Sequence, residues 1–209
     1  MNKIKDFLEY YTTKQQIPLS FKAASSEASF KLKKIGNPDS ITIKMSTDNG
    51  TTWTDLNIDT TVTLPVGTVC LLSGANTSFS KDSENYYQFE IVDDIQVYGD
   101  LMSLCDYSRE LNEDYQFYAL FSGCTGIKGT PDLTAYKLTI GCYQNMFYGC
   151  TGIVNALDLK APTLYPSCYM NMFYGCSSLS TTPSLPATEL AWSCYRAMFR
   201  GCSNLPAAP

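Results

Sequence analysis

Cysteines are the residues of this chain with the widest chemical scope. The chain contains nine cysteines and no histidine. It therefore lacks the commonest general base and the commonest metal ligand, and no two cysteines have the Cys-x-x-Cys spacing of zinc sites. A glycosidase carboxylate pair has no sequence signature, because its spacing is set in space, and nothing indicates one. We predict no catalytic residue, no metal site and no cofactor, and we do not expect an enzyme.

The spacing of the cysteines argues against disulfide bonds. Cys142 and Cys150 would lie about 12 Å apart along a helix axis at 1.5 Å per residue, whereas bridged Cα atoms lie within about 7 Å. Cysteines separated by 26 residues would lie on neighbouring helices, which pack about 8–10 Å apart. We therefore predict buried free thiols that act as small hydrophobic side chains.

One acidic segment begins like a calcium-binding loop. Asp55, Asn57 and Asp59 alternate as the first three ligands of an EF-hand do, but Thr60 stands where the turn needs glycine. Val66 stands where the bidentate glutamate belongs. We interpret this segment as a strand edge and a turn.

The second half of the chain repeats with a period of 26 residues. The four-residue motif Phe121–Cys124 recurs at 147–150, 173–176 and 199–202 without any insertion. The pair Cys142-Tyr143 also recurs at this period, although the first copy has Gln116-Phe117 instead. Positions that keep their residue type are expected to pack in a core, and positions that vary are expected to face solvent.

Each repeat is predicted to contain a short helix and a short strand. Cys142 with Met146, and Tyr143 with Phe147, are i,i+4 pairs that would share one side of a helix. Gly149 suits the C-terminus of that helix, and a column of prolines favours an extended segment after it. The fold class predicted is mixed α and β, with an α/β solenoid over 99–209 whose last repeat is incomplete.

The repeat closely resembles the BspA-like leucine-rich repeats of bacterial surface proteins. The resemblance is carried by the pattern Cys-Tyr-x-x-Met-Phe-x-Gly-Cys-x-x-Leu followed by Pro-x-Leu-Pro-Ala-Thr-x-Leu, clearest in Cys168–Leu190. It covers about half of the chain, from Gly99 to Pro209. It implies a leucine-rich-repeat solenoid with a parallel strand ladder, a role in adhesion and host interaction, and no catalytic residues.

The first half of the chain has the alternation of antiparallel strands. Period-2 patterns occur at 29–33, 40–45, 61–64, 68–72 and 87–92. Asn49-Gly50 provides the positive φ angles of a hairpin turn. We predict a β-sandwich of immunoglobulin-like architecture over 17–98, preceded by an arm or short helix over 1–16.

The candidate binding residues come from columns that vary between repeats. Tyr148 and Tyr174 give way to Ser122 and Arg200 in the outer copies, and Trp192 replaces Pro166 and Ile140 in its column. The predicted strand ladder would present a small, mostly polar and nearly uncharged face that includes two aspartates, although an ordinary solvated face is the alternative. The candidates are Tyr148, Tyr174, Arg200, Trp192, Asp132 and Asp158.

Composition restricts the partners. The net charge is −5, no cluster of lysine and arginine stands out, and no apolar stretch reaches the roughly 18 residues of a membrane span. We therefore expect no nucleic acid partner and no membrane insertion. The first residues lack the apolar core of a signal peptide because Asp6 and Glu9 interrupt it.

Together these features predict a non-enzymatic recognition or adhesion protein. The expected ligand is a glycan or a protein, and the expected location is extracellular, on a cell surface or on a virion. Self-association or anchoring would use the N-terminal region. The alternative is a structural component or spacer of a phage particle or cell surface with no ligand of its own.

Overall fold

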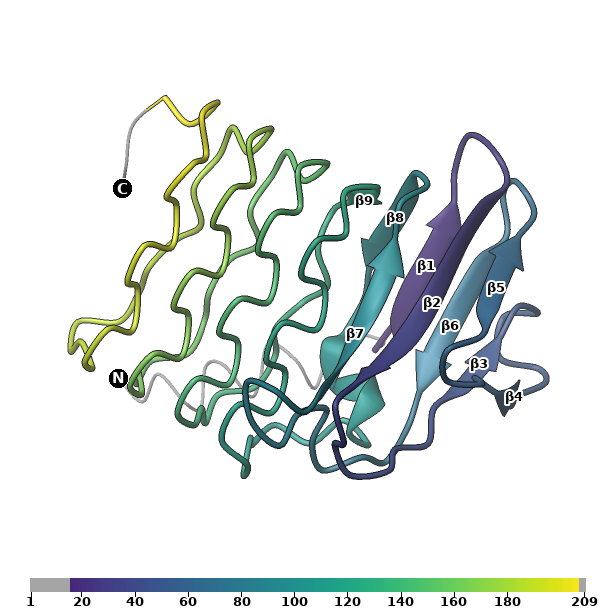
Figure 1. Cartoon of the computed structure of the whole chain (residues 1–209), viewed down its shortest axis with the longest axis horizontal. Coiled ribbons are helices and arrows are strands. Elements are labelled where there is room, and N and C mark those ends of the chain that lie inside the picture. The colour runs from purple at the N-terminus through teal and green to yellow at the C-terminus, as the bar shows by residue number, and fades with distance from the viewer. Residues whose placement is uncertain (1–15, 207–209) are drawn as a thin grey trace.

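The computed structural model describes residues 16–206 and shows two β-sheets followed by a stack of irregular coils (Figure 1). The larger sheet has the strand order β4-β3-β6-β1-β8-β9 and the smaller has the order β5-β2-β7. The strands of the larger sheet are β1 (Leu19–Ala23), β3 (Lys44–Ser46), β4 (Thr54–Asp55), β6 (Val69–Ser73), β8 (Ile95–Tyr98) and β9 (Ile127–Lys128). Those of the smaller are β2 (Ala28–Ile35), β5 (Thr61–Leu64) and β7 (Tyr86–Ile91).

The two sheets face each other across an aromatic core. Phe21 of β1 packs edge-on against Phe30 of β2 and Phe89 of β7, with ring centroids 4.9 and 5.0 Å apart. Alternate residues of β2 and β7 are buried, as period-2 patterning requires. The predicted hairpin is present, because β3 pairs antiparallel with β4 and both Asn49 and Gly50 have positive φ angles.

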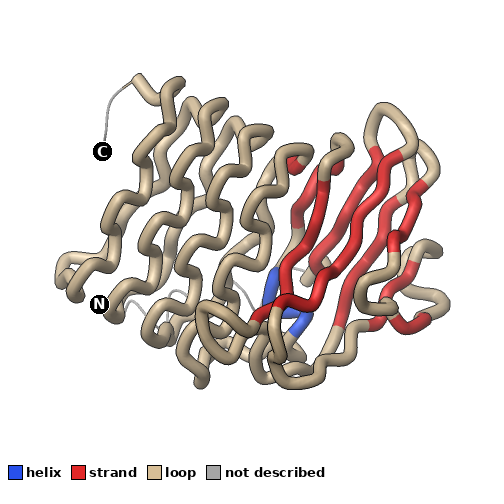
Figure 2. Tube along the Cα trace, viewed as in Figure 1, coloured by secondary structure: helices blue, strands red, loops and turns tan. Residues whose placement is uncertain are grey.

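The predicted α/β leucine-rich-repeat solenoid is wrong. Among the described residues of the second half, the only helix is the short 3-10 helix η1 (Leu101–Leu104) and the only strand is β9. Figure 2 shows the rest of the coils as loops and turns. The mixed α and β fold class therefore does not hold, and the predicted helix over Cys142–Cys150 is absent.

Backbone angles explain why no helix forms. Gly141, Asn145 and Gly149 have φ angles of 59°, 59° and 69°, whereas an α-helix needs negative φ at every residue. The equivalent positions of the other copies share this left-handed conformation. The chain therefore makes a series of four-residue turns. We call the four segments 115–123, 141–149, 167–175 and 193–201 the turn segments.

Along a turn segment, the backbone N–H groups alternate between two kinds of acceptor. One kind is a carbonyl of the same segment, and the other is a carbonyl of the next coil. The N–H groups of Tyr143, Asn145 and Phe147 donate to carbonyls 25 residues further on, at 2.9 to 3.0 Å. The N–H groups of the residues between them donate to the carbonyl three residues before. Every second amide thus joins adjacent coils, and the described turn segments are joined by five such bonds at each interface.

The constant columns of the repeat form continuous stacks of side chains inside the coils. The Phe121, Phe147 and Phe173 rings are nearly parallel, with centroids 5.6 and 5.5 Å apart. Tyr143 and Tyr169 stack in a second column at 5.8 Å. These side chains are almost fully buried, so the prediction that constant columns pack in a core is confirmed.

The sheets and the coils share one hydrophobic core. Phe89 of β7 stacks on Phe121 of the first turn segment at 5.2 Å, and its N–H donates to the carbonyl of Leu120 at 2.7 Å. Strand β9 pairs in parallel with β8. The sheets therefore cover the starting side of the coil stack. The arm or helix predicted over 1–16 lies outside the described residues, apart from Gln16.

Candidate functional site

The outward side chains of the turn segments form a surface that we call the turn face. It includes the column Ser122, Tyr148, Tyr174 and Arg200, whose members lie on successive coils. Tyr148 is 40% exposed, Arg200 is exposed and Tyr174 is half-buried. Three of the six predicted binding residues therefore come together, and they do so because 26 residues make one coil.

Tyr174 lies between two planar groups. Its ring is parallel to that of Tyr148 within 7°, with centroids 4.7 Å apart. The Arg200 guanidinium lies 5.7 Å from the centroid of Tyr174, within the range of a cation–π contact. Tyr174 is thereby fixed by neighbours on both coils, so the column presents ring edges, hydroxyl groups and a guanidinium to solvent.

Ser122 leaves space beside Tyr148. The equivalent positions of the next two coils carry tyrosine, whereas the first coil has this small side chain. A Cβ atom added to the neighbouring Gly123 would meet no atom within 4 Å. Among the described residues, no ring or cation stacks on the side of Tyr148 that faces Ser122. Within residues 16–206, this face of Tyr148 is therefore free of ring and cation contacts.

A ladder of amide side chains fixes the neighbouring column. The Asn171 amide donates to Oδ1 of Asn145 at 3.0 Å, and the Asn145 amide donates to the hydroxyl of Tyr118 at 3.0 Å. Tyr118 in turn contacts Tyr86 of β7 edge-on at 5.2 Å. These contacts connect the turn face to the small sheet, so its side chains are held before any partner binds.

The turn face carries no acidic side chain. The four turn segments contain no aspartate, glutamate or lysine, and their only charged residues are Arg196 and Arg200. Both arginines are exposed. In a chain with a net charge of −5, the last turn segment, which carries both arginines, is a local region of positive charge.

Trp192 lies just before the last turn segment and is the most exposed large apolar residue among those described, at 75%. Ile140 and Tyr165, which precede earlier turn segments, are each 38% exposed. All three residues lie within two positions of the start of a turn segment. The prediction that Trp192 is on the surface is therefore confirmed.

Asp132 and Asp158 lie outside the turn segments, on the extended part of the coils. The backbone of Asp132 bonds to Gly99 and Leu101, and the carboxylate of Asp158 accepts a hydrogen bond from the hydroxyl of Ser184 at 3.1 Å. Both residues are exposed. The structure does not bring them into the Tyr148 column.

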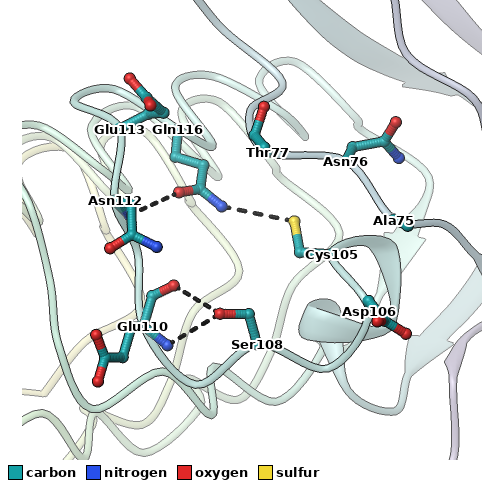
Figure 3. Close-up of a pocket in the computed structure, with 10 residues that line it drawn as sticks. All are labelled: Ala75, Asn76, Thr77, Cys105, Asp106, Ser108, Glu110, Asn112, Glu113 and Gln116. Atoms are coloured by element: carbon teal, nitrogen blue, oxygen red, sulfur yellow. Dashed lines mark hydrogen bonds between the residues drawn. The ribbon is translucent and has the colours of Figure 1, made fainter.

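A polar trough lies where the sheets meet the first coil (Figure 3). Two adjoining hollows of about 270 and 390 Å³ share Thr77, Asn112 and Glu113. Gln116 lines the first hollow and is 3% exposed. Sequence reasoning did not select these residues. The one available signal was that Gln116 occupies a column that is cysteine in every later copy.

The cysteine chemistry of the site is limited. All nine thiols are free and buried, as predicted, although the helical distance used for Cys142 and Cys150 does not apply. Burial raises the pKa of Cys124 to about 12. Its Sγ donates to the carbonyl of Phe89 at 3.0 Å. A protonated, inaccessible thiol is a poor nucleophile and a poor metal ligand.

Within residues 16–206 no group of three or more histidine, cysteine, aspartate or glutamate side chains is arranged to hold a metal ion. No helix in this part of the chain is long and apolar enough to cross a membrane. Comparison with family models, with curated proteins and with solved structures gave no match. The geometry of the turn face and of the trough must therefore carry any functional conclusion.

Proposed function

We propose that this protein is a non-enzymatic recognition protein that docks a protein partner on its turn face. The observation that supports this most directly is the Tyr148–Tyr174–Arg200 stack in a surface without carboxylates. Tyrosine, tryptophan, methionine and arginine are enriched at protein interfaces, and lysine, glutamate and aspartate are depleted. The location on a cell surface rests on the repeat's resemblance to the BspA-like repeats of bacterial surface proteins.

A protein partner fits the turn face better than a glycan does. Sugar rings bind aromatic residues by lying flat on an open ring face. Tyr148 covers one face of Tyr174, and Arg200 covers the other. One face of Tyr148 stays open, so the stack offers a sugar a single ring face. The same face can take a planar side chain of a protein partner, and Arg196 and Arg200 favour acidic residues around it.

The spacer function is the second candidate. It is favoured by the unbroken ladder of backbone hydrogen bonds between coils, which would make the stack a stiff rod whatever it binds. The two functions differ in one respect. Recognition depends on the outward side chains of the turn segments, whereas a spacer depends only on the buried columns and the backbone.

Parallel selection from a random peptide display library tests the proposal. One selection uses the unmodified chain, and the other uses the double variant Tyr148→Ser/Arg200→Ser. Serine occurs naturally at the equivalent Ser122, so the first substitution should preserve the fold. We expect peptides rich in aspartate and aromatic residues to be enriched on the unmodified chain only.

The dissociation constants of the selected peptides decide the outcome. Tyr148→Ser is expected to weaken binding at least about tenfold, which is typical of residues that dominate an interface. Asp158→Asn, on the extended part of the coils, serves as the matched control and should leave the constant unchanged. Equal enrichment on both proteins would favour the spacer.

A further inference from the structure

The trough beside the first coil is preformed by two backbone ties. Ala75 and Cys105 form an isolated antiparallel bridge, and the N–H of Phe79 donates to the carbonyl of Gln116 at 2.8 Å. Between these ties the wall formed by 75–79 is much shorter than the wall formed by 105–116. The longer wall must bow outward, which opens the hollow seen in Figure 3.

The floor of the trough has a buried amide with weak partners. Gln116 is 3% exposed. Its Oε1 accepts from the N–H of Asn112 at 3.4 Å, and its Nε2 donates to Sγ of Cys105 at 3.5 Å. The contact with Asn112 is long, the contact with Cys105 is made to a weak sulfur acceptor, and a primary amide has two donors and two lone pairs. A ligand hydroxyl could both donate to this group and accept from it.

The rim of the trough is polar and mainly acidic. Asp106, Glu110 and Glu113 line the first hollow, where Lys137 forms an ion pair with Glu110 at 3.2 Å. The second hollow adds Asp39, Asp114 and one cation, Lys81. The pKa of Glu110 is lowered by hydrogen bonds from Tyr136 and Lys137. That direction is opposite to the one a general acid needs, so the rim suits binding better than catalysis.

We infer that the trough is a second binding site, separate from the turn face, for a small polyhydroxylated ligand bearing a protonated amine, such as an amino sugar. The buried Gln116 amide meets ring hydroxyls, the carboxylates at the rim meet the ammonium group, and the hollows are near the lower end of the size range of ligand sites. Anionic sugars are repelled by the same rim.

Nuclear magnetic resonance titration of the ¹⁵N-labelled chain tests this inference, with glucosamine, glucose and glucuronate as probes. We expect amide shifts at the walls of the trough with glucosamine, about tenfold weaker binding of glucose, and none with glucuronate. The butylammonium ion serves as a probe of charge alone. Binding of this ion as tight as that of glucosamine, or glucuronate binding in the trough, would overturn the inference.

Two variants separate the floor from the rim. Gln116→Cys restores the residue found at Cys142, Cys168 and Cys194, so it should fold, and it should lower the affinity for both glucosamine and glucose at least about tenfold. Glu113→Gln should weaken the binding of glucosamine and leave the binding of glucose unchanged. Glu27→Gln, at an exposed position outside the trough, is the matched control. Unchanged affinities in both trough variants would exclude the site. The turn face is not involved, so its peptide binding should persist in either variant.

Discussion

The Arg109 guanidinium donates to Oδ2 of Asp100 at 2.8 Å, and both side chains are largely buried, with exposures of 14% and 7%. The other carboxylate oxygen accepts from the N–H of Met102 at 3.0 Å and from the hydroxyl of Thr134 at 2.6 Å. One aspartate thus connects the end of the sheets, helix η1 and the first coil. Its removal would leave a buried arginine without its carboxylate.

We expect Asp100→Ala to lower the free energy of unfolding by about 3–5 kcal/mol, as for other broken buried ion pairs, when measured by urea denaturation. The exposed pair of Lys128 and Asp94, at 3.2 Å, provides the control. Asp94→Ala should lower the free energy of unfolding by less than about 1 kcal/mol. Similar losses in the two variants would mean that the buried pair does not hold the junction.

The buried thiols predict unfolding in alkali. Burial raises the pKa of Cys70, Cys105 and Cys168 to about 12 from 9.0. A raised pKa in the folded state gives stability that is present below pH 9 and is lost as pH rises toward 12, because the unfolded chain ionises first. Between pH 9 and pH 12, each such thiol would lower the free energy of unfolding by about 1.4 kcal/mol per pH unit.

Circular dichroism between pH 7 and 11 checks this prediction, with a parallel count of thiols that react with a disulfide reagent. We expect few reactive thiols at pH 8 and cooperative loss of structure above pH 9, accompanied by exposure of the cysteines. A signal that stays constant to pH 11 would show that the thiols are not buried as described.

Asn145 tests the turn geometry of the coils. It has a left-handed backbone with φ of 59°, and its side chain belongs to the ladder between Asn171 and Tyr118. Asn145→Ala copies Ala119 and Ala197, which share this conformation. It should cost only about 1 kcal/mol for the lost hydrogen bonds.

Asn145→Val should cost a further 1–2 kcal/mol or so, because a β-branched residue strains a left-handed backbone. Thermal unfolding of the two variants measures the difference. In an α-helix, alanine would instead be at least as stable as asparagine, so an increase in stability with Asn145→Ala would contradict the turn geometry.

The Tyr143 hydroxyl has no hydrogen-bond partner among the described residues, although the side chain is 1% exposed. Phe117 stacks on it in the same column at 5.8 Å and does without a hydroxyl. Tyr143→Phe should therefore raise the free energy of unfolding by up to about 1 kcal/mol, since it removes an unsatisfied buried polar group. Destabilisation would reveal a bound water molecule or a partner outside residues 16–206.

The sequence allowed the stacking columns to be predicted but not the backbone that carries them. A constant spacing places Phe121 above Phe147 whatever the local conformation is. The i,i+4 pairs such as Cys142 and Met146 fit a four-residue turn as well as a helix. Gly141, Asn145 and Gly149 were a signal for repeated left-handed residues, but the alanine at 119 obscured it.

The candidate site was predictable to a similar extent. Tyr148, Tyr174 and Arg200 meet because they are one coil apart, which is a property of the repeat itself. The trough depends on the tie between Phe79 and Gln116, which are far apart in sequence and in different kinds of segment. No local sequence pattern predicts such a tie, and most residues that line the trough are polar types common on protein surfaces.

The alternation of backbone bonds also means that the number of residues in a coil cannot change by one. Because only every second amide reaches the next coil, deleting one residue within a turn segment would bring the wrong amides to the interface, while excising or duplicating a whole 26-residue unit would keep every bond in register. The number of coils can therefore change only in whole steps. Such steps would lengthen or shorten the turn face without redesigning the core.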